Sequence, residues 1–226
     1  MLLPPCSETE LLERAESIAG QTLGFLAKQC NVVVPKNLNT HKGWIGDLLE
    51  TTLGANAGSQ PQPDFVDLGI ELKTIPVNIH GQPQESTYIC VAPLLAPHGL
   101  CWENSLVQCK LQKVLWVPIS AANNEPLTNR RIGRPFLWQP NQIQELALKQ
   151  DWEELTESMI LGGIESLSAK MGRYLQIRPK AAHSRVRAEA LNEYGQTITT
   201  VPRGFYLRAR FTQMIISQYF SLTAND

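Results

Sequence analysis

Three residues of one stretch have the types and the spacing that metal-assisted hydrolysis requires. Asp64, preceded by Pro63, is followed after six residues by Glu71-Leu72-Lys73. In a β-strand successive side chains point to opposite faces, so Glu71 and Lys73 share one face while Leu72 points into the core. A bend before that strand would bring the carboxylate of Asp64 beside that of Glu71. Two carboxylates supply the hard oxygen ligands that Mg²⁺ prefers, here next to an ammonium group.

This set of groups suits the hydrolysis of phosphodiesters. An activated water attacks phosphorus, and the negative charge that builds on the phosphoryl oxygens is stabilised by a metal ion and a lysine. These residue types by themselves also allow a second interpretation, a strand with a charged solvent face and no catalytic role, because Glu-x-Lys is common on such strands. Apolar residues nearby predict a strand with one buried side. They are Val66, Leu68, Ile70, Leu72 and Ile75.

A helix upstream is expected to position a third carboxylate. Its apolar residues recur at helical spacing. They are Trp44, Ile45, Leu48, Leu49 and Leu53. Asp47 and Glu50 are three residues apart and therefore fall on a shared side of this helix. If the helix packs beside the strand, Glu50 joins Asp64 and Glu71.

The stretches around these residues closely resemble the MutH family of mismatch-repair endonucleases, which belongs to the PD-(D/E)xK nuclease superfamily. They read KGWIGDLLE, LGANAGSQPQPDF and LGIELKTIPV, and the match continues in order through TYICVAPL, KVLWVPI, QDWEEL, YLQIRPKAA and PRGFYLR. It covers the chain from Glu8 to about Phe220. The resemblance implies an α/β fold with a restriction-endonuclease-like mixed sheet flanked by helices. Residues 1–226 would form one nuclease domain with two lobes, or arms, that make a DNA-binding cleft.

The resemblance also implies a Mg²⁺-dependent DNA endonuclease, with Mn²⁺ or Ca²⁺ as substitute ions. Such an enzyme nicks the unmethylated strand of double-stranded DNA at hemimethylated GATC sites. It is activated by MutL, which relays mismatch recognition by MutS. By matched position, Asp64, Glu71 and Glu50 hold the metal. Lys73 orients or activates the water and offsets charge in the transition state.

Residues that read the DNA follow from the same match. Arg178, Pro179 and Lys180 in the RPK motif lie near base edges, and Tyr206 faces the target adenine. The sequence alone leaves Tyr206 equally open to a place in a small core of its own arm. Gly204, two residues earlier, is expected to let the chain turn tightly.

Two further residues are candidate DNA contacts. Lys42 stands at the expected start of the Glu50 helix, where a phosphate is favoured. The alternative is an ordinary solvated lysine. The resemblance favours the first interpretation, because the matching lysine of the family lies close to DNA. Tyr88 either faces the minor groove or packs in the sheet. It stands where the family has a phenylalanine, and Pro63 stands where a glutamine is familiar.

The charge distribution is uneven along the chain. The net charge of −1 argues against an indiscriminate nucleic-acid binder. Between residues 170 and 211, however, nine basic and two acidic residues give a net charge of +7, so the rest of the chain has a net charge of −8. The nine are Lys170, Arg173, Arg178, Lys180, Arg185, Arg187, Arg203, Arg208 and Arg210. This part is expected to read DNA, with Arg185 and Arg187 on phosphates; a solvated helix face is the alternative.

Composition places the chain among globular proteins, with 43% hydrophobic and 18% charged residues. Five scattered cysteines form no C-x-x-C pair and fit reduced thiols of a cytosolic protein. No apolar run approaches the roughly 20 residues that span a bilayer, and Pro4 and Pro5 interrupt the apolar start. We expect a soluble, cytoplasmic monomer without a membrane partner.

A long amphipathic helix is predicted from residue 141 to about 161. Its apolar residues are expected to face the core. They are Ile143, Leu146, Trp152, Leu155 and Ile160. The acidic residues Asp151, Glu153, Glu154 and Glu157 are expected to form a solvated face.

Two other functions remain open at this stage. The first is a GATC-specific restriction endonuclease of the same fold, which would cut both strands without a partner. The second is a catalytically idle module that binds DNA or docks to MutL. All four catalytic letters, Glu50, Asp64, Glu71 and Lys73, are present, so the sequence gives no sign of decay.

Overall fold

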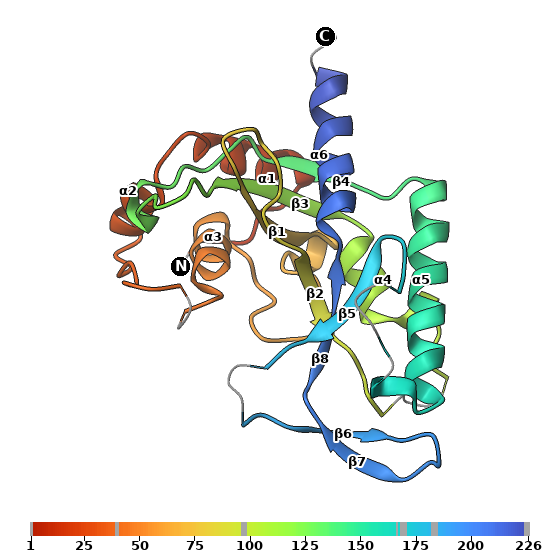
Figure 1. Cartoon of the computed structure of the whole chain (residues 1–226). Helices are drawn as coiled ribbons and strands as arrows, with labels where there is room; N and C mark the ends of the chain where they lie inside the picture. Colours follow the sequence, from red (N-terminus) through yellow and green to blue (C-terminus); the bar gives the residue numbers. More distant parts are fainter. Residues whose placement is uncertain are drawn as a thin grey trace. The chain divides into compact units, whose positions relative to one another are not determined.

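The structure is a computed structural model that describes residues 2–38, 41–95, 99–165, 167, 171–181 and 185–223. It separates into two compact units (Figure 1). The first consists of Met1–Glu85, Gln112–Gln139 and Ile215–Asp226, and the second of Ser86–Leu111 and Pro140–Met214. Within the described residues, no helix is both long and apolar enough to cross a membrane.

The first unit contains N-terminal helices and a mixed sheet. Its helices are α1 (Glu8–Ser17), α2 (Leu23–Gln29) and α3 (Trp44–Leu53), with the short 3-10 helices η1 (Val66–Leu68) and η3 (Leu127–Asn129). Its strands are β1 (Glu71–Val77), β3 (Val114–Ser120) and β4 (Phe136–Trp138), in the order β1-β3-β4. β1 and β3 are parallel, whereas β3 and β4 are antiparallel. Helices and a mixed sheet confirm the predicted α/β class.

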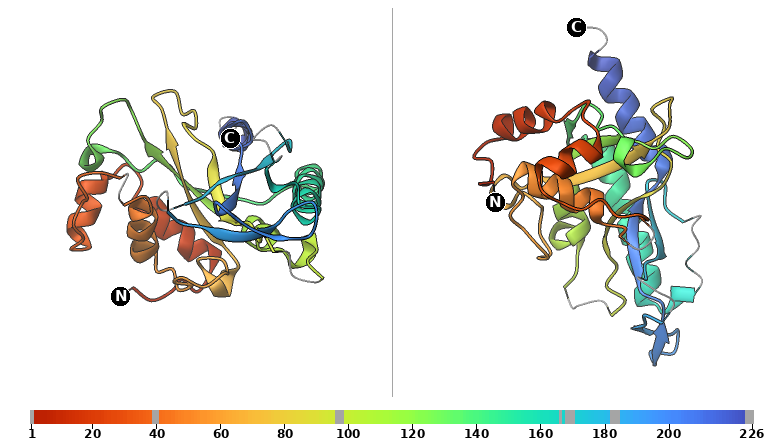
Figure 2. Two further views of the ribbon diagram at one scale, coloured as in Figure 1. Left: turned by 60° about the horizontal axis from the view of Figure 1, so that its bottom comes forward. Right: turned by 90° about the vertical axis from the view of Figure 1, so that its left-hand side faces the viewer.

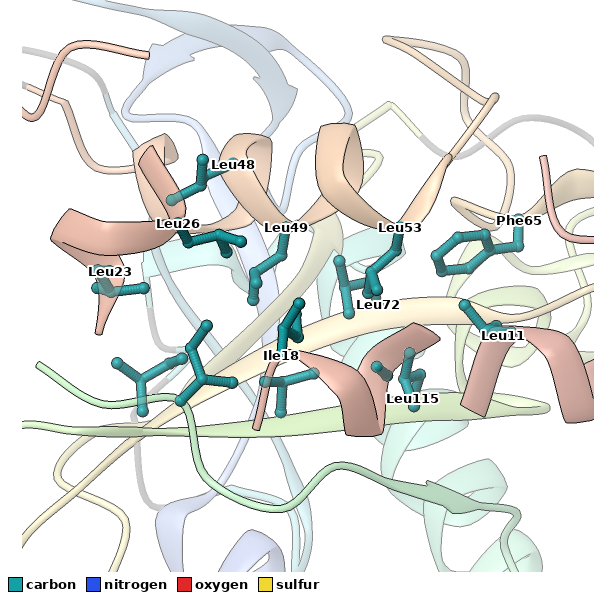
Figure 3. Packing of buried hydrophobic residues seen from close by; sticks show 14 of the residues in the cluster. Leu11, Ile18, Leu23, Leu26, Leu48, Leu49, Leu53, Phe65, Leu72 and Leu115 are labelled. Carbon is teal, nitrogen blue, oxygen red and sulfur yellow. The ribbon is translucent and has the colours of Figure 1, made fainter. Parts of the chain in front are cut away.

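The central strand β3 explains why this sheet is stable. Its sequence VLWVPIS is buried from Val114 to Ile119, as expected for a strand covered on both faces. Figure 3 shows Leu49 and Leu53 of α3 pointing toward Leu72 and Leu115, with α1 in the same cluster. Figure 2 shows α3, in orange, close to β1, which it contacts. α3 is thereby fixed against the strand that carries Glu71.

The second unit contains an antiparallel sheet, a hairpin and helices. Its sheet has the order β2-β8-β5 and is formed by β2 (Thr87–Val91), β8 (Arg203–Leu207) and β5 (Leu175–Pro179). The strands β6 (Ala188–Leu191) and β7 (Thr197–Thr200) pair as a separate hairpin. The helices are η2 (Trp102–Asn104), α4 (Leu106–Leu111), α5 (Gln142–Ile160) and η4 (Gly163–Glu165). α6 (Ala209–Thr223) begins in this unit and ends in the first.

The orientation of α5 corrects the sequence prediction. Trp152 and Leu155 are buried as expected, but Ile143, Leu146 and Ile160 are 72%, 61% and 53% exposed. The buried side instead consists of Gln144, Leu148, Asp151, Trp152, Leu155, Thr156 and Met159. These positions follow a helical period, so the helix is rotated relative to the predicted apolar face.

Asp151 lies on this buried side of α5. Its side chain is buried rather than solvated, and its carboxylate accepts the backbone N–H groups of Arg173 (2.6 Å), Tyr174 (2.5 Å) and Leu175 (2.8 Å). A carboxylate that accepts three N–H groups satisfies backbone donors that would otherwise be unpaired at the start of β5. The prediction of a solvated acidic face is therefore wrong for Asp151. Glu153, Glu154 and Glu157 are all exposed on the helix, as predicted.

Candidate active site

Asp64 is held at the start of β1 by a closed loop. Phe65 and Ile70 exchange backbone hydrogen bonds (2.9 and 3.3 Å) around η1, and Gly69 supplies the left-handed residue at φ 63° that this turn requires. The backbone N–H of Leu72 donates to Asp64 Oδ2 over 2.8 Å. The carbonyl of Asp64 in turn accepts the N–H of Asn56 at 3.0 Å. The six residues between Asp64 and Glu71 thus form the bend that returns the carboxylate to the strand.

Glu71 and Lys73 lie on the same face of β1 and form an ion pair. Lys73 Nζ is 2.5 Å from Glu71 Oε1. The side chain of Glu71 is 1% exposed and that of Lys73 is 15% exposed. Leu72, between them, is packed in the core of the unit. A charged pair this deeply placed needs its partner, because a buried charge without one is costly.

Glu50 is carried to the same place by α3. The helix buries Trp44, Leu48, Leu49 and Leu53, which leaves Glu50 on the side shared with Asp47. The pKa of Glu50 is raised from its ordinary value of 4.5 to about 7, chiefly by burial and then by the charges of Asp64 and Asp47. Lys73 opposes this rise, and Glu71 adds to it. The effect shows that Glu50, Asp64, Glu71 and Lys73 lie within electrostatic range of one another.

The donor chemistry of this cluster fits Mg²⁺. The cluster offers carboxylate oxygens, and the crowding of negative charge that raises the pKa of Glu50 is relieved by a divalent cation. Among the residues described, no group of three or more His, Cys, Asp or Glu side chains is already arranged to hold a metal ion. Mg²⁺ does not require such a cage, because it is usually bound by one or two carboxylates together with waters and substrate phosphates.

Lys42 lies outside this cluster but on the same segment. It is exposed and stands immediately before Gly43, the N-cap residue of α3. The first N–H groups of a helix attract phosphate, so its position agrees with the predicted phosphate contact without testing it.

In the second unit, one face of the β2-β8-β5 sheet gathers four of the predicted DNA-reading residues. Tyr88 pairs with Tyr206 across the strands, and their rings meet edge to face with centroids 5.3 Å apart. The guanidinium of Arg178 lies 5.8 Å from the ring of Tyr206, and Lys180 Nζ lies 4.1 Å from the ring of Tyr88. Both contacts are cation–π interactions. We call these four residues the reading face.

The opposite face of this sheet is its core. Leu175, Ile177, Phe205 and Leu207 are buried there, alternating with residues of the reading face as strand geometry requires. Tyr206 is only partly buried, so it belongs to the reading face and not to the sheet's core.

Gly204 has a different role from the one expected. It lies inside β8. Its φ is not in the left-handed region, unlike that of several other glycines in the chain. A Cβ at this position would lie 2.8 Å from Tyr88 Cε2 and 3.0 Å from the carbonyl oxygen of Cys90. The prediction of a tight turn at Gly204 is therefore wrong. The glycine provides room for the ring of Tyr88 over the strand.

Two arginines of the basic segment are bonded to the protein's own backbone. Arg208 donates to the carbonyl oxygens of Gly172 and Met171, and Arg210 donates to that of Arg173. Burial lowers the pKa of Arg208. These two arginines stabilise the backbone that leads into β5, so the count of +7 overstates the charge available to DNA.

The remaining predicted contacts lie at the end of β5 and beyond it. Pro179 is exposed and pairs with Arg203 at the end of the sheet. Arg185 and Arg187 are exposed in the segment before β6. Lys170 lies outside the described residues.

Sequence reasoning missed two residues beside the reading face. Gln176 is 6% exposed and donates from Nε2 to Ser86 Oγ over 2.8 Å. Gln176 stands two residues before Arg178, and Ser86 two before Tyr88. The alternation of a strand places each on the same face as its neighbour, which is the signal that would have revealed them.

Fold and site together define the class. The first strand of a mixed sheet presents Glu71 and Lys73, and Asp64 is held at the start of that strand. This is the arrangement of restriction-endonuclease-like DNA endonucleases, which are hydrolases.

Comparison with known proteins then gives the family. The family model described as "DNA mismatch repair enzyme MutH" matches residues 53–151. Proteins named DNA mismatch repair protein MutH from Yersinia pseudotuberculosis serotype IB, Yersinia enterocolitica serotype O:8 and Yersinia pestis are each 50% identical over 219 residues. The match covers 97% of this chain and 96% of each relative. The chain belongs to the MutH family of DNA mismatch repair enzymes.

Proposed function

We propose that this protein is a Mg²⁺-dependent endonuclease that nicks the unmethylated strand of hemimethylated GATC sites. The observation that carries the proposal is the placement of Asp64, Glu71 and Lys73 at the start of β1, with Asp64 Oδ2 fixed by the N–H of Leu72. Membership of a mismatch repair family supports a role in strand incision.

Asp64 and Glu71 would hold the ion, with Glu50 beside them. When bound, Mg²⁺ supplies a Lewis acid that stabilises charge on the scissile phosphate. Lys73, already held by Glu71 at 2.5 Å, orients the attacking water and places an ammonium beside the phosphoryl oxygens. Glu50, whose pKa is about 7, can exchange a proton near neutral pH.

The reading face would supply sequence recognition. Arg178 and Lys180 carry donors that suit guanine acceptors in the major groove. Both lie over tyrosine rings, which limits their motion. Tyr206 offers an aromatic edge to the adenine N6 position, where a methyl group adds bulk and removes one donor. Pro179 fixes the backbone between the two cations.

The remaining contacts serve affinity. Lys42, Arg185 and Arg187 are exposed cations that suit phosphates of any sequence. Tyr88 would reach the minor groove or support Tyr206, whose ring it touches. The activating partner is MutL, with MutS acting through it, and the protein works as a cytoplasmic monomer.

One experiment separates this proposal from its alternatives. A circular plasmid with a single hemimethylated GATC site is incubated with the protein and Mg²⁺, with and without MutL. The proposal predicts nicked circles, formed slowly by the protein alone and much faster with MutL. Linear product without MutL would instead indicate a restriction endonuclease, and intact plasmid under both conditions would indicate an idle binding module.

A further inference from the structure

Ser86 lies beside the reading face without having been assigned any role there. It precedes β2 and stands two residues before Tyr88, so it lies on the side of the sheet where Gln176 and Arg178 emerge from β5. It is partly buried.

Two donors converge on the hydroxyl oxygen of Ser86. Gln176 Nε2 donates to Ser86 Oγ over 2.8 Å, and Arg178 Nη1 donates to the same atom over 3.3 Å. A serine hydroxyl accepts at most two hydrogen bonds and donates one. Both of its acceptor sites are therefore in use, and Gln176, which is 6% exposed, anchors the oxygen from the interior.

The consequence concerns the freedom of Arg178. Its side chain is exposed, and an exposed arginine loses much rotamer entropy when it is fixed on a base edge. Here Ser86 Oγ holds one end of the guanidinium, and the ring of Tyr206 lies 5.8 Å from its centre. A side chain restrained before binding loses less freedom on binding, and its fixed direction favours one base over others.

We propose that Ser86 is a positioning residue that holds Arg178 in the direction needed for base recognition, with Gln176 as its anchor. The inference rests on the proposed function, because it assumes that Arg178 reads a base. Ser86 would then affect sequence discrimination through Arg178 and not through a contact of its own with DNA.

The test compares cleavage of a GATC duplex with cleavage of a duplex in which the G·C pair is replaced. Both duplexes compete in one Mg²⁺-containing reaction, so the amount of active enzyme cancels from the ratio of rates. Ser86→Ala should lower this ratio about 2- to 10-fold, the range of one hydrogen bond. Ser86→Thr keeps the hydroxyl and should retain the parent ratio. Ser17→Ala, an exposed serine of α1, is the matched control.

A double-mutant cycle shows whether Ser86 acts through Arg178. Arg178→Ala should lower the ratio more strongly, by about 5- to 100-fold. Adding Ser86→Ala to Arg178→Ala should then change nothing further, because the residue that Ser86 positions is gone. Effects that multiply would show that Ser86 contacts DNA independently and would overturn the inference.

Folding and function are separated by a second pair of variants. Thr and Val have nearly the same shape, so the Ser86→Thr and Ser86→Val variants differ from each other only in the hydroxyl group. Their comparison remains informative even if Ser86→Ala does not fold. Equal ratios of cleavage rates for Ser86→Thr and Ser86→Val would overturn the inference about Ser86. The proposed function would still stand if the parent protein prefers the GATC duplex. A parent that shows no preference for GATC would overturn both.

Discussion

The backbone N–H of Leu72 donates to Asp64 Oδ2 over 2.8 Å, which fixes one carboxylate at the point where β1 begins. Leu72 is itself anchored in the core against α1 and α3. Asp64 is therefore positioned by a residue whose own place is set by packing. The bond also fixes the direction of the Asp64 carboxylate relative to β1.

The first prediction concerns the two carboxylates at the start of β1. Asp64→Asn should keep a weaker form of the bond from Leu72, since an amide oxygen also accepts, but should weaken metal binding. Cleavage should fall by at least about 100-fold, and Glu71→Gln should act similarly. DNA binding should persist or improve, because negative charge near the phosphate is removed. Nicking rates and binding constants are compared with Asp67→Asn, an exposed aspartate of η1; near-parental nicking by either variant would refute the assignment.

A second prediction separates the two roles of Lys73. Lys73→Ala should abolish cleavage and also destabilise the fold by about 3 kcal/mol, because the carboxylate of Glu71, 1% exposed, loses its partner. Adding Glu71→Gln should restore much of the stability without restoring cleavage. The free energy of unfolding is measured by urea denaturation. Lys113→Ala, which breaks the more exposed pair with Glu8, should cost at most about 1 kcal/mol; an equal cost for both lysines would contradict the argument.

The third prediction follows from the pKa of Glu50. Its folded-state pKa of about 7 lies above the ordinary 4.5, so its protonation favours the folded state. The contribution of protonated Glu50 to the free energy of unfolding is fully present below about pH 4.5 and is lost as the pH rises through 7. Glu50→Gln should therefore be more stable than the parent at pH 8 by about 1–2 kcal/mol, after allowance for solvent screening, and equal to it near pH 4.

Denaturation curves at the two pH values measure this difference. Mg²⁺ added at pH 8 should narrow it, because a cation stabilises the charged carboxylate of the parent. A gap that is the same at both pH values would show that Glu50 does not titrate as described.

The fourth prediction concerns methylation. Tyr206→Ser removes the ring that contacts Tyr88 and Arg178, so the variant should nick methylated strands more readily. Nicking of unmethylated, hemimethylated and fully methylated GATC duplexes is compared. The control is Tyr194→Ser, which alters a tyrosine that is 77% exposed. Unchanged discrimination in a folded Tyr206→Ser variant would place methyl recognition elsewhere.

Much of the candidate active site could be predicted because its information is local. Asp64, Glu71 and Lys73 lie within one short stretch, and strand alternation places Glu71 and Lys73 on one face. The period of α3 is equally clear, with four buried apolar residues opposite Glu50. The sequence could not show that the loop closes through Phe65 and Ile70, since such pairing depends on backbone geometry.

Other features depend on partners distant in the chain. Asp151 is buried and accepts three N–H groups more than 20 residues away, on a side of α5 that its apolar pattern does not indicate. Gly204 serves the ring of Tyr88, and Ser86 serves residues of β5. Each of these roles depends on a contact between segments that are distant in the chain, which a pattern of residue types along the chain does not specify.

Strand-resolved cleavage of a single duplex tests the central claim most directly. The two strands of a hemimethylated GATC duplex carry different labels, and the duplex is incubated with the protein, Mg²⁺ and MutL. We predict release of label from the unmethylated strand alone, at the GATC site, and none without Mg²⁺. Equal cleavage of both strands, or cleavage independent of the GATC sequence, would contradict the account.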